Sequence, residues 1–335
     1  MPLEEIIAGI ILLSVIIYGV LGGADFGGGI WDIFATGARK DAQRAAIAKA
    51  IGPVWEANHV WLIFIIVLLF TAFPFAFYAL SIGLFIPFHL VLIGITLRGA
   101  AFVFRAYGSK TDSAQHRWGT VFGAASIITP VLLGMSLGAV SAGSLRVING
   151  EIKIEGDLPW FAPISIAIGV LALALCSYLA AVYLTNETTA DLQEDFRRRA
   201  LLAGTVVVGL AVLTMPLIYY EARHLWSNLV SFQVMPIIIQ GVVAALFSGW
   251  GLLTRRYQLA RFATIVQVSL LLAGWGMAQY PYIIYPDVTL HDAAAPIATL
   301  KFLLYTLPIG MVLLVPSLWF LFIVFKGNKQ STTHN

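Results

Sequence analysis

The sequence predicts an all-α, polytopic integral membrane protein with nine transmembrane helices. Of its 335 residues, 59% are hydrophobic and only 11% are charged, whereas soluble domains carry roughly 25% charged residues. The mean hydropathy is +0.88. Backbone polar groups inside hydrocarbon must bond within the protein, and the alternation typical of barrel strands is absent, so the apolar runs predict helices.

Nine segments reach the length of about 20 mostly apolar residues that a span requires. Between the fourth and fifth, residues 146–157 alternate around Asn149-Gly150, which predicts a small surface hairpin. The nine spans are expected at 6–33, 53–73, 76–104, 118–143, 160–185, 200–219, 232–253, 262–279 and 300–325.

Lysine and arginine are unevenly distributed over the two ends of these spans. Three lie on the side of the N-terminus: Arg146, Lys153 and Arg223. Fifteen lie on the other side: Arg39, Lys40, Arg44, Lys49, Arg105, Lys110, Arg117, Arg197, Arg198, Arg199, Arg255, Arg256, Arg261, Lys326 and Lys329. Cytoplasmic loops carry the excess of basic residues, so we expect the N-terminus outside and the C-terminus in the cytoplasm. The asymmetry also explains the net charge of +3, and we expect no nucleic-acid partner.

The first span carries an acid, Asp25, within the sequence GVLGGADFGGGIWD. Ionisable groups inside hydrocarbon are costly and therefore mark candidate functional sites. Gly19, Gly23 and Gly27 recur every four residues and form a bare face against which another helix can pack closely. The alternative is that Asp25 is a packing carboxylate bonded to an adjacent helix, because an unpaired buried carboxylate is unfavourable.

The second span begins with IGPVWEANHVWLIF, and its uninterrupted apolar run is too short to cross alone. The helix is therefore expected to begin near Pro53, which places Glu56 and His59 within the membrane boundary. A helix N-terminus favours the anion and burial favours the neutral acid, so Glu56 is a candidate for proton transfer. The alternative is an interfacial carboxylate exposed to water.

The third span carries Arg98 and Arg105, seven residues apart and therefore on one helix face. Arg105 is expected to extend to the cytoplasmic surface. Arg98 is deeper and requires a partner such as Asp25 or Glu56. A purely structural ion pair and a catalytic role are equally compatible with this pattern.

Metal and haem sites are not expected in this chain. Glu56 and Glu221 each begin an E-x-x-H unit, as in di-iron carboxylate proteins. They belong to opposite ends of the spans, separated by most of a roughly 30 Å hydrocarbon layer. Only His59 and His89 fall within spans, at different depths. The single cysteine, Cys176, cannot form a thiolate metal site alone.

Three motifs together resemble subunit II of cytochrome bd-type quinol oxidases, including the cyanide-insensitive branch. They are GGADFGGGIWD on the first span, GPVWEANHVWLI on the second and RGAAFVFR on the third. The resemblance implies a single transmembrane domain over residues 1–335, built from two four-helix bundles plus one peripheral helix. The first bundle corresponds to about 6–143, and the second bundle with the peripheral helix to about 160–325.

The resemblance also implies a complex in the bacterial cytoplasmic (inner) membrane that oxidises quinol and reduces dioxygen to water. Haems b and d are expected in a haem-bearing subunit I of similar fold, and none in this chain, which is not catalytic alone. A small single-span accessory subunit is a further candidate partner. Membrane lipid or a bound quinone are candidate ligands.

In that family, subunit II is thought to contribute part of a proton route toward the oxygen site, and Asp25 and Glu56 occupy the matching positions. Glu56 replaces the Asp of other members, which retains the acid. Val103 replaces an acid that some members carry two residues before Arg105. The residues expected to support the route are Trp55, Asn58, His59, Arg98 and Arg105.

A secondary ion or solute transporter is the alternative function. The glycine-rich first span and the buried acids resemble the discontinuous helices of such proteins. However, no later part of the chain repeats GGADFGGG in an inverted arrangement.

Overall fold

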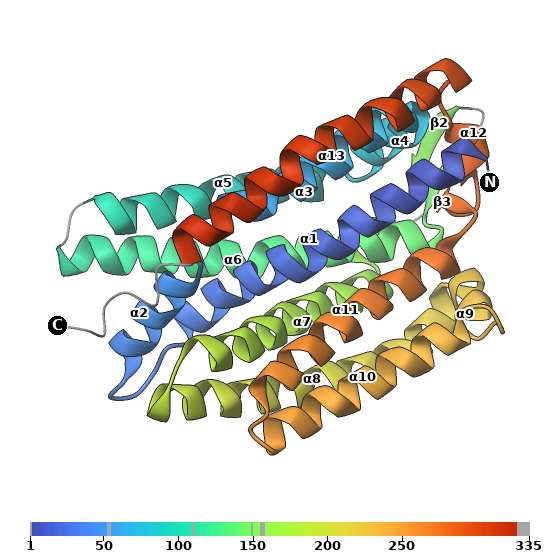
Figure 1. Ribbon diagram of the computed structural model, residues 1–335. Helices are drawn as coiled ribbons and strands as arrows, with labels where there is room; N and C mark the ends of the chain where they lie inside the picture. Colours follow the sequence, from blue (N-terminus) through green and yellow to red (C-terminus); the bar gives the residue numbers. More distant parts are fainter. Residues whose placement is uncertain (1, 52–54, 109–110, 149, 155–157, 327–335) are drawn as a thin grey trace.

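The computed structural model describes residues 2–51, 55–108, 111–148, 150–154 and 158–326. Long helices run side by side through the molecule, with short helices at both ends and the strands at the end where the N-terminus lies (Figure 1). The elements are α1 (Leu3–Ile33), α2 (Lys40–Ile51), α3 (Trp55–Ala72), α4 (Pro74–Gly83), α5 (Phe85–Tyr107), α6 (Asp112–Ala142), β1 (Leu145–Ile148), β2 (Glu151–Ile154), η1 (Pro159–Phe161), α7 (Pro163–Glu187), α8 (Ala190–Glu221), α9 (Arg223–Leu229), α10 (Met235–Leu253), α11 (Tyr257–Gln279), β3 (Tyr282–Ile284), β4 (Val288–Thr289), α12 (Leu290–Ala293) and α13 (Ile297–Lys326).

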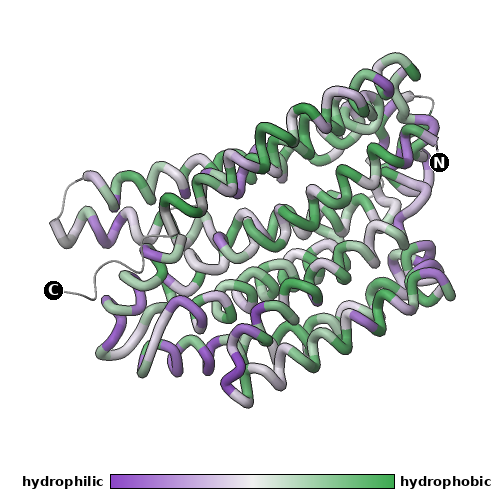
Figure 2. The backbone as a smooth tube through the Cα atoms, viewed as in Figure 1, coloured by the Kyte–Doolittle hydropathy of each residue, from purple (hydrophilic) through white to green (hydrophobic). Residues whose placement is uncertain are grey.

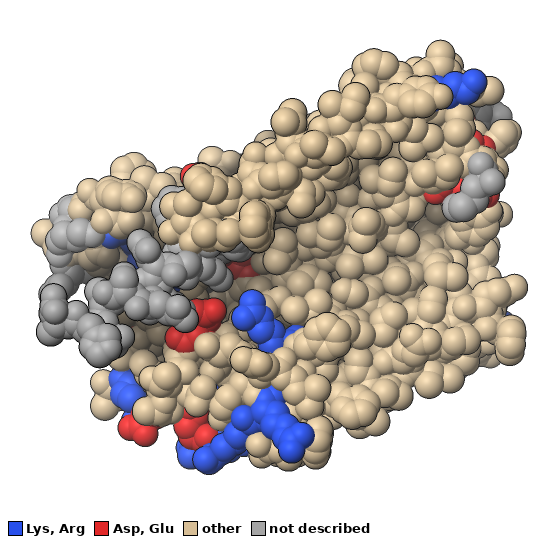
Figure 3. Space-filling view, in the orientation of Figure 1, with Lys and Arg blue, Asp and Glu red and all other residues tan. Residues whose placement is uncertain are grey.

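The predicted all-α, polytopic membrane fold is confirmed. Among the described residues, eight helices are long and apolar enough to cross a membrane, and the bent pair α3–α4 supplies a ninth when it counts as one span. Hydrophobic residues fill the middle of the long helices, and hydrophilic residues gather toward both ends (Figure 2). Lys and Arg side chains are most abundant at the end where α8 begins and α10 turns into α11 (Figure 3).

The third predicted span, 76–104, is wrong at its start. The chain bends by 119° between α3 and α4, and the long helix α5 begins only at Phe85. Pro74 has no backbone N–H with which to continue the preceding helix. Because the sequence is apolar on both sides of the bend, hydropathy alone does not predict it.

Helix α1 is central to the packing. It contacts α3 and α6 on one side and α7 and α11 on the other, while α5 packs against α6. Helices α7, α8, α10 and α11 form the second group, and α13 lies outside against α1 and α3. Only 11% of the apolar 18-residue stretch of α13 is buried, so α13 is peripheral within this chain.

The predicted hairpin at the N-terminal end of the molecule is present as the antiparallel pair β1–β2, with Ile148 opposite Glu151. Arg146 donates to both carboxylate oxygens of Asp287, at 2.7 and 3.0 Å, and the Val147 N–H donates to the same carboxylate at 2.8 Å. Asp287 lies in the connection between α11 and α13. These bonds therefore join two connections that are distant in the sequence.

The contact of Asp287 with the hairpin is expected to weaken in acid. Hydrogen bonds from Arg146 hold the pKa of the Asp287 carboxyl below its ordinary value. The stabilisation is therefore present above the unfolded-state pKa of about 3.9 and lost as the pH falls through the lower folded-state pKa. Asp287→Asn removes a charge-assisted bond that contributes about 1.5 kcal/mol. Hydrogen exchange of the Val147 amide at neutral pH should become roughly tenfold faster.

The exposed hairpin acid Glu151 provides the matched control. Glu151→Gln should leave the exchange rate of the Val147 amide unchanged. After correction for the intrinsic effect of pH on amide exchange, the rate in Asp287→Asn should vary less with pH than the rate in the wild type. Equal protection of Val147 in the wild type and in Asp287→Asn at neutral pH would contradict this assignment.

Candidate functional site

Asp25 on α1 and Arg98 on α5 form an ion pair in the interior of the first helix group, which comprises α1, α3, α5 and α6. Arg98 Nη1 donates to Asp25 Oδ2 at 3.2 Å, and Nη2 lies 3.1 Å from Oδ1. Nη2 also donates to the Asp25 carbonyl oxygen at 2.9 Å. Asp25 is 4% exposed and Arg98 is 1% exposed. The structure thus supplies the partner that the depth of Arg98 requires.

Further contacts of Arg98 offset much of the free-energy cost of removing its charge from water. Nε donates to Ser126 Oγ at 3.1 Å, and Ser126 in turn donates to the Phe122 carbonyl at 2.7 Å. The guanidinium also lies 5.2 Å from the ring centre of Phe26 and 5.0 Å from that of Phe122. A buried pair requires such additional bonds to offset desolvation.

The Asp25 carboxylate is less completely satisfied than the guanidinium. Its Oδ1 lies at ion-pair distance from Arg98, but among the described residues no donor is aligned for a hydrogen bond to it. This oxygen therefore interacts with Arg98 through charge rather than through an aligned hydrogen bond.

A second pair repeats the first, seven residues further along both helices. Arg105 Nη1 donates to Asp32 Oδ2 at 2.9 Å, and Nη2 donates to Oδ1 at 3.2 Å. The Asp32 side chain is 4% exposed and that of Arg105 is 21% exposed. Seven helical residues correspond to roughly 10 Å along the axis. The ring of Phe122 lies between the two guanidinium groups, 5.6 Å from Arg105 Cζ.

Sequence reasoning missed Asp32 and predicted only that Arg105 extends toward the surface. The available signal was the matching interval, because both the acids on the first span and the arginines on the third are seven residues apart. The pairing shows that Arg105 is anchored by a carboxylate rather than simply extended into water.

The first turns of α3 pack against α1 beside the Asp25–Arg98 pair. Asn58 is 4% exposed, and its Nδ2 lies 3.5 Å from the Leu21 carbonyl. The ring centre of His59 lies 6.0 Å from those of both Tyr18 and Phe26 on α1. His59 is therefore close to the pair, and both Asp25 and Arg98 act on it electrostatically.

Glu56 is exposed in the first turn of α3. Within the described part of the chain, no hydrogen bond or ion pair joins it directly to Asp25. Trp55 begins α3, and its side chain lies outside the described residues, as does Pro53.

The three glycines of α1 lie against the second helix group. A Cβ atom at Gly27 would overlap the Cys176 carbonyl oxygen of α7, and one at Gly23 would lie 3.1 Å from Leu179. A Cβ at Gly19 would lie 2.6 Å from Leu272 of α11. The absence of side chains at these positions lets α1 approach both helices closely, as small residues commonly do in membranes.

The other residues considered as metal or haem ligands lie in different parts of the structure. Glu221 ends α8 and accepts a hydrogen bond from the Ile164 N–H at 3.1 Å, whereas Glu56 begins α3. His224 stacks on Tyr285 with ring centres 4.4 Å apart, and His89 Nδ1 lies 2.7 Å from the Phe85 carbonyl. Among the described residues, no group of three or more His, Cys, Asp or Glu side chains could hold a metal ion.

Comparison with known proteins identifies the family. Residues 3–325 match the family model described as cytochrome bd terminal oxidase subunit II. The chain is 32% identical over 207 residues to a Bacillus subtilis protein named cytochrome bd ubiquinol oxidase subunit 2, covering 59% of each chain. It is 25% identical over 326 residues to the cytochrome bd-I ubiquinol oxidase subunit 2 of Escherichia coli, covering 86% of this chain and 82% of that one.

The fold is shared with a chain of the bd oxidase from Geobacillus thermodenitrificans. The two superimpose with a TM-score of 0.83 at 24% sequence identity, covering 98% of this chain and 100% of the other. Because the family model matches nearly the entire length, the chain belongs to the cytochrome bd terminal oxidase subunit II family.

Proposed function

We propose that this chain is the haem-free subunit II of a quinol:oxygen oxidoreductase and carries part of the cytoplasmic proton route. The observation that carries this proposal is the buried Asp25–Arg98 pair, in which no donor among the described residues is aligned with Oδ1 of Asp25. Haems b and d, bound in the partner subunit I, would supply electron transfer and oxygen reduction. Family membership favours this function over the secondary-transporter alternative.

The chemistry assigned to this chain is acid–base chemistry. Glu56 is exposed at the start of α3 and can exchange protons with water. The carboxylate of Asp25 lies deeper, beside Arg98, and is proposed as the next proton carrier of the route. Asn58 and His59, on α3 beside α1, support the connection between the two acids. Trp55 is proposed as a further supporting residue.

The second pair extends this arrangement toward the end of the molecule where the basic residues gather. Asp32 is buried and Arg105 is partly exposed, so the Asp32–Arg105 pair is proposed to fix α1 against α5 at the mouth of the route. Its role is to position the two helices, because Arg105 engages both carboxylate oxygens of Asp32.

Co-purification tests the subunit assignment. A tagged form of this chain should carry the spectra of haems b and d when it is produced together with its haem-bearing subunit I. The tagged chain produced without that partner should show no haem absorbance, because it offers no matched pair of axial ligands. Stoichiometric haem in the partner-free chain would contradict the proposal.

The proposed orientation places the N-terminus outside the cytoplasm and the C-terminus inside. Reporter fusions after Lys49 and Arg199 should therefore give cytoplasmic signals, and a fusion after Glu151 should give an external one. A cytoplasmic signal from the Glu151 fusion would overturn the orientation.

A further inference from the structure

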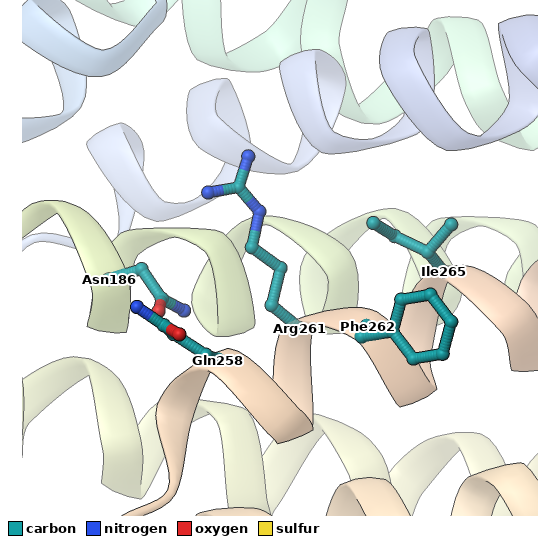
Figure 4. Close-up of a pocket in the computed structure, with 5 residues that line it drawn as sticks. All are labelled: Asn186, Gln258, Arg261, Phe262 and Ile265. Carbon is teal, nitrogen blue, oxygen red and sulfur yellow. The ribbon is translucent and has the colours of Figure 1, made fainter.

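An open cavity of about 360 Å³ lies between the end of α7 and the first turns of α11. It is lined by Asn186, Gln258, Arg261, Phe262 and Ile265. In Figure 4, Asn186 and Gln258 lie together on one side, Arg261 extends across α7, and Phe262 and Ile265 lie further along α11. The cavity therefore has a polar end near the start of α11 and an apolar end toward the middle of the helix.

Arg261 is the charged group of this cavity, and within the described chain no carboxylate pairs with it. The guanidinium Cζ lies 4.6 Å from the ring centre of Tyr183, and the residue is half-buried. Three arginines at the same end differ from Arg261, because each lies near a carboxylate. Arg197 and Arg198 lie 2.7 and 3.4 Å from Glu194, and Arg255 lies 3.7 Å from the same carboxylate. Arg261 thus bonds to the side chain of Tyr183, but among the described residues it has no carboxylate to balance its charge at the cavity.

The polar groups beside Arg261 are partly fixed in place. Asn186 Nδ2 donates to the Tyr257 carbonyl at 3.1 Å and lies 3.3 Å from that of Val182. Its Oδ1 can therefore accept a hydrogen bond from a hydroxyl group in the cavity. Gln258 is exposed and carries both a donor and an acceptor.

The apolar end of the cavity continues onto the exposed surface of α11. Phe262 is 67% exposed, although it lies within a helix long and apolar enough to span a membrane. A ligand that satisfies both ends must combine an anionic group, hydroxyl groups and an apolar chain. A free anion would leave Phe262 and Ile265 uncovered, and a neutral quinone would leave Arg261 without a counter-ion.

We propose that this cavity binds one anionic phospholipid of the phosphatidylglycerol type. Its phosphate contacts Arg261, its glycerol hydroxyls bond to Asn186 and Gln258, and an acyl chain lies along Phe262 and Ile265. The site is at the basic end of the molecule, where arginine side chains attract anionic headgroups. This assignment does not depend on the proton route.

Lipid binding to the purified two-subunit complex tests the proposal. The complex is stripped in neutral detergent, and phosphatidylglycerol or phosphatidylcholine is titrated while bound lipid is counted by native mass spectrometry. Wild-type complex should bind one phosphatidylglycerol more tightly than phosphatidylcholine. Arg261→Gln should weaken phosphatidylglycerol binding about 5-fold, the effect of one basic side chain at an anionic surface. Arg261→Lys should retain most of the binding.

The matched control is Arg256→Gln, since Arg256 belongs to the same basic end but stacks on Trp250 at 5.0 Å outside the cavity. It should bind phosphatidylglycerol like the wild type. Equal phosphatidylglycerol binding by wild type and Arg261→Gln would overturn the proposal, as would equal affinity for the two lipids. Displacement of the lipid by inorganic phosphate alone would show a free-anion site, and quinone retained in place of lipid would show a quinone site. Either outcome would also overturn it.

Discussion

Combining Asp25→Asn with Glu56→Gln is expected to slow oxygen reduction by the assembled complex about 10²–10⁴-fold, the usual effect of losing a proton-transfer group. Both substitutions retain the size of the side chain and remove the titratable group. Asp25→Asn also removes the negative charge that pairs with Arg98, so haem content must be measured beside activity. The measurement is oxygen uptake with quinol at several pH values, with haem spectra as the control for assembly. The single substitutions show which acid limits the rate.

The matched control is Asp41→Asn, because Asp41 is an exposed acid on α2 at the same end of the molecule. Its oxygen uptake should equal that of the wild type. Full activity of the double variant with normal haem would rule out the proton route through these acids. Loss of haem together with activity would instead favour a structural role for Asp25.

Arg98→Met is expected to destabilise the complex strongly, because it leaves the buried Asp25 carboxylate without its partner. Removing one member of a buried ion pair typically costs about 3–5 kcal/mol, whereas replacing both members with apolar residues is often neutral. The double variant Arg98→Met/Asp25→Leu should therefore recover much of the lost stability. Thermal unfolding of the purified complex measures the change.

Measuring oxygen reduction distinguishes the structural role of the Asp25–Arg98 pair from the proposed role of Asp25 in proton transfer. The recovered double variant should assemble with haem but still reduce oxygen slowly, because it has no acid at position 25. Arg105→Met should be less damaging than Arg98→Met, since the Arg105 side chain is 21% exposed and Asp32 can regain water. If the double variant were as unstable as Arg98→Met, the unpaired Asp25 carboxylate would not be the cause of the instability.

Hydropathy predicted most of the long helices because the membrane requires continuous apolar runs. Hydropathy gave wrong boundaries where the end of a helix does not coincide with the end of its apolar run. Helix α8 begins at Ala190, and so contains Arg197 to Arg199, although the apolar run begins only at residue 200. The connection 34–52, which is polar in sequence, contains the helix α2. Hydrogen bonding continues through such segments irrespective of their hydropathy.

The candidate site was only partly predictable, for a related reason. Asp25 and Arg98 were recognisable individually, since a charge in an apolar run requires compensation. Asp32 sits at the end of its span, where a carboxylate needs no special explanation.

Proton uptake by the complex itself tests the route most directly. The fully reduced complex is mixed with dioxygen, and uptake from the medium is followed with a pH-indicator dye while haem absorbance reports electron transfer. The proposed route predicts that Asp25→Asn/Glu56→Gln slows proton uptake about 100-fold or more, whereas electron transfer that precedes uptake keeps its wild-type rate. Proton uptake at the wild-type rate, in a double variant with full haem content, would contradict a proton route through this chain.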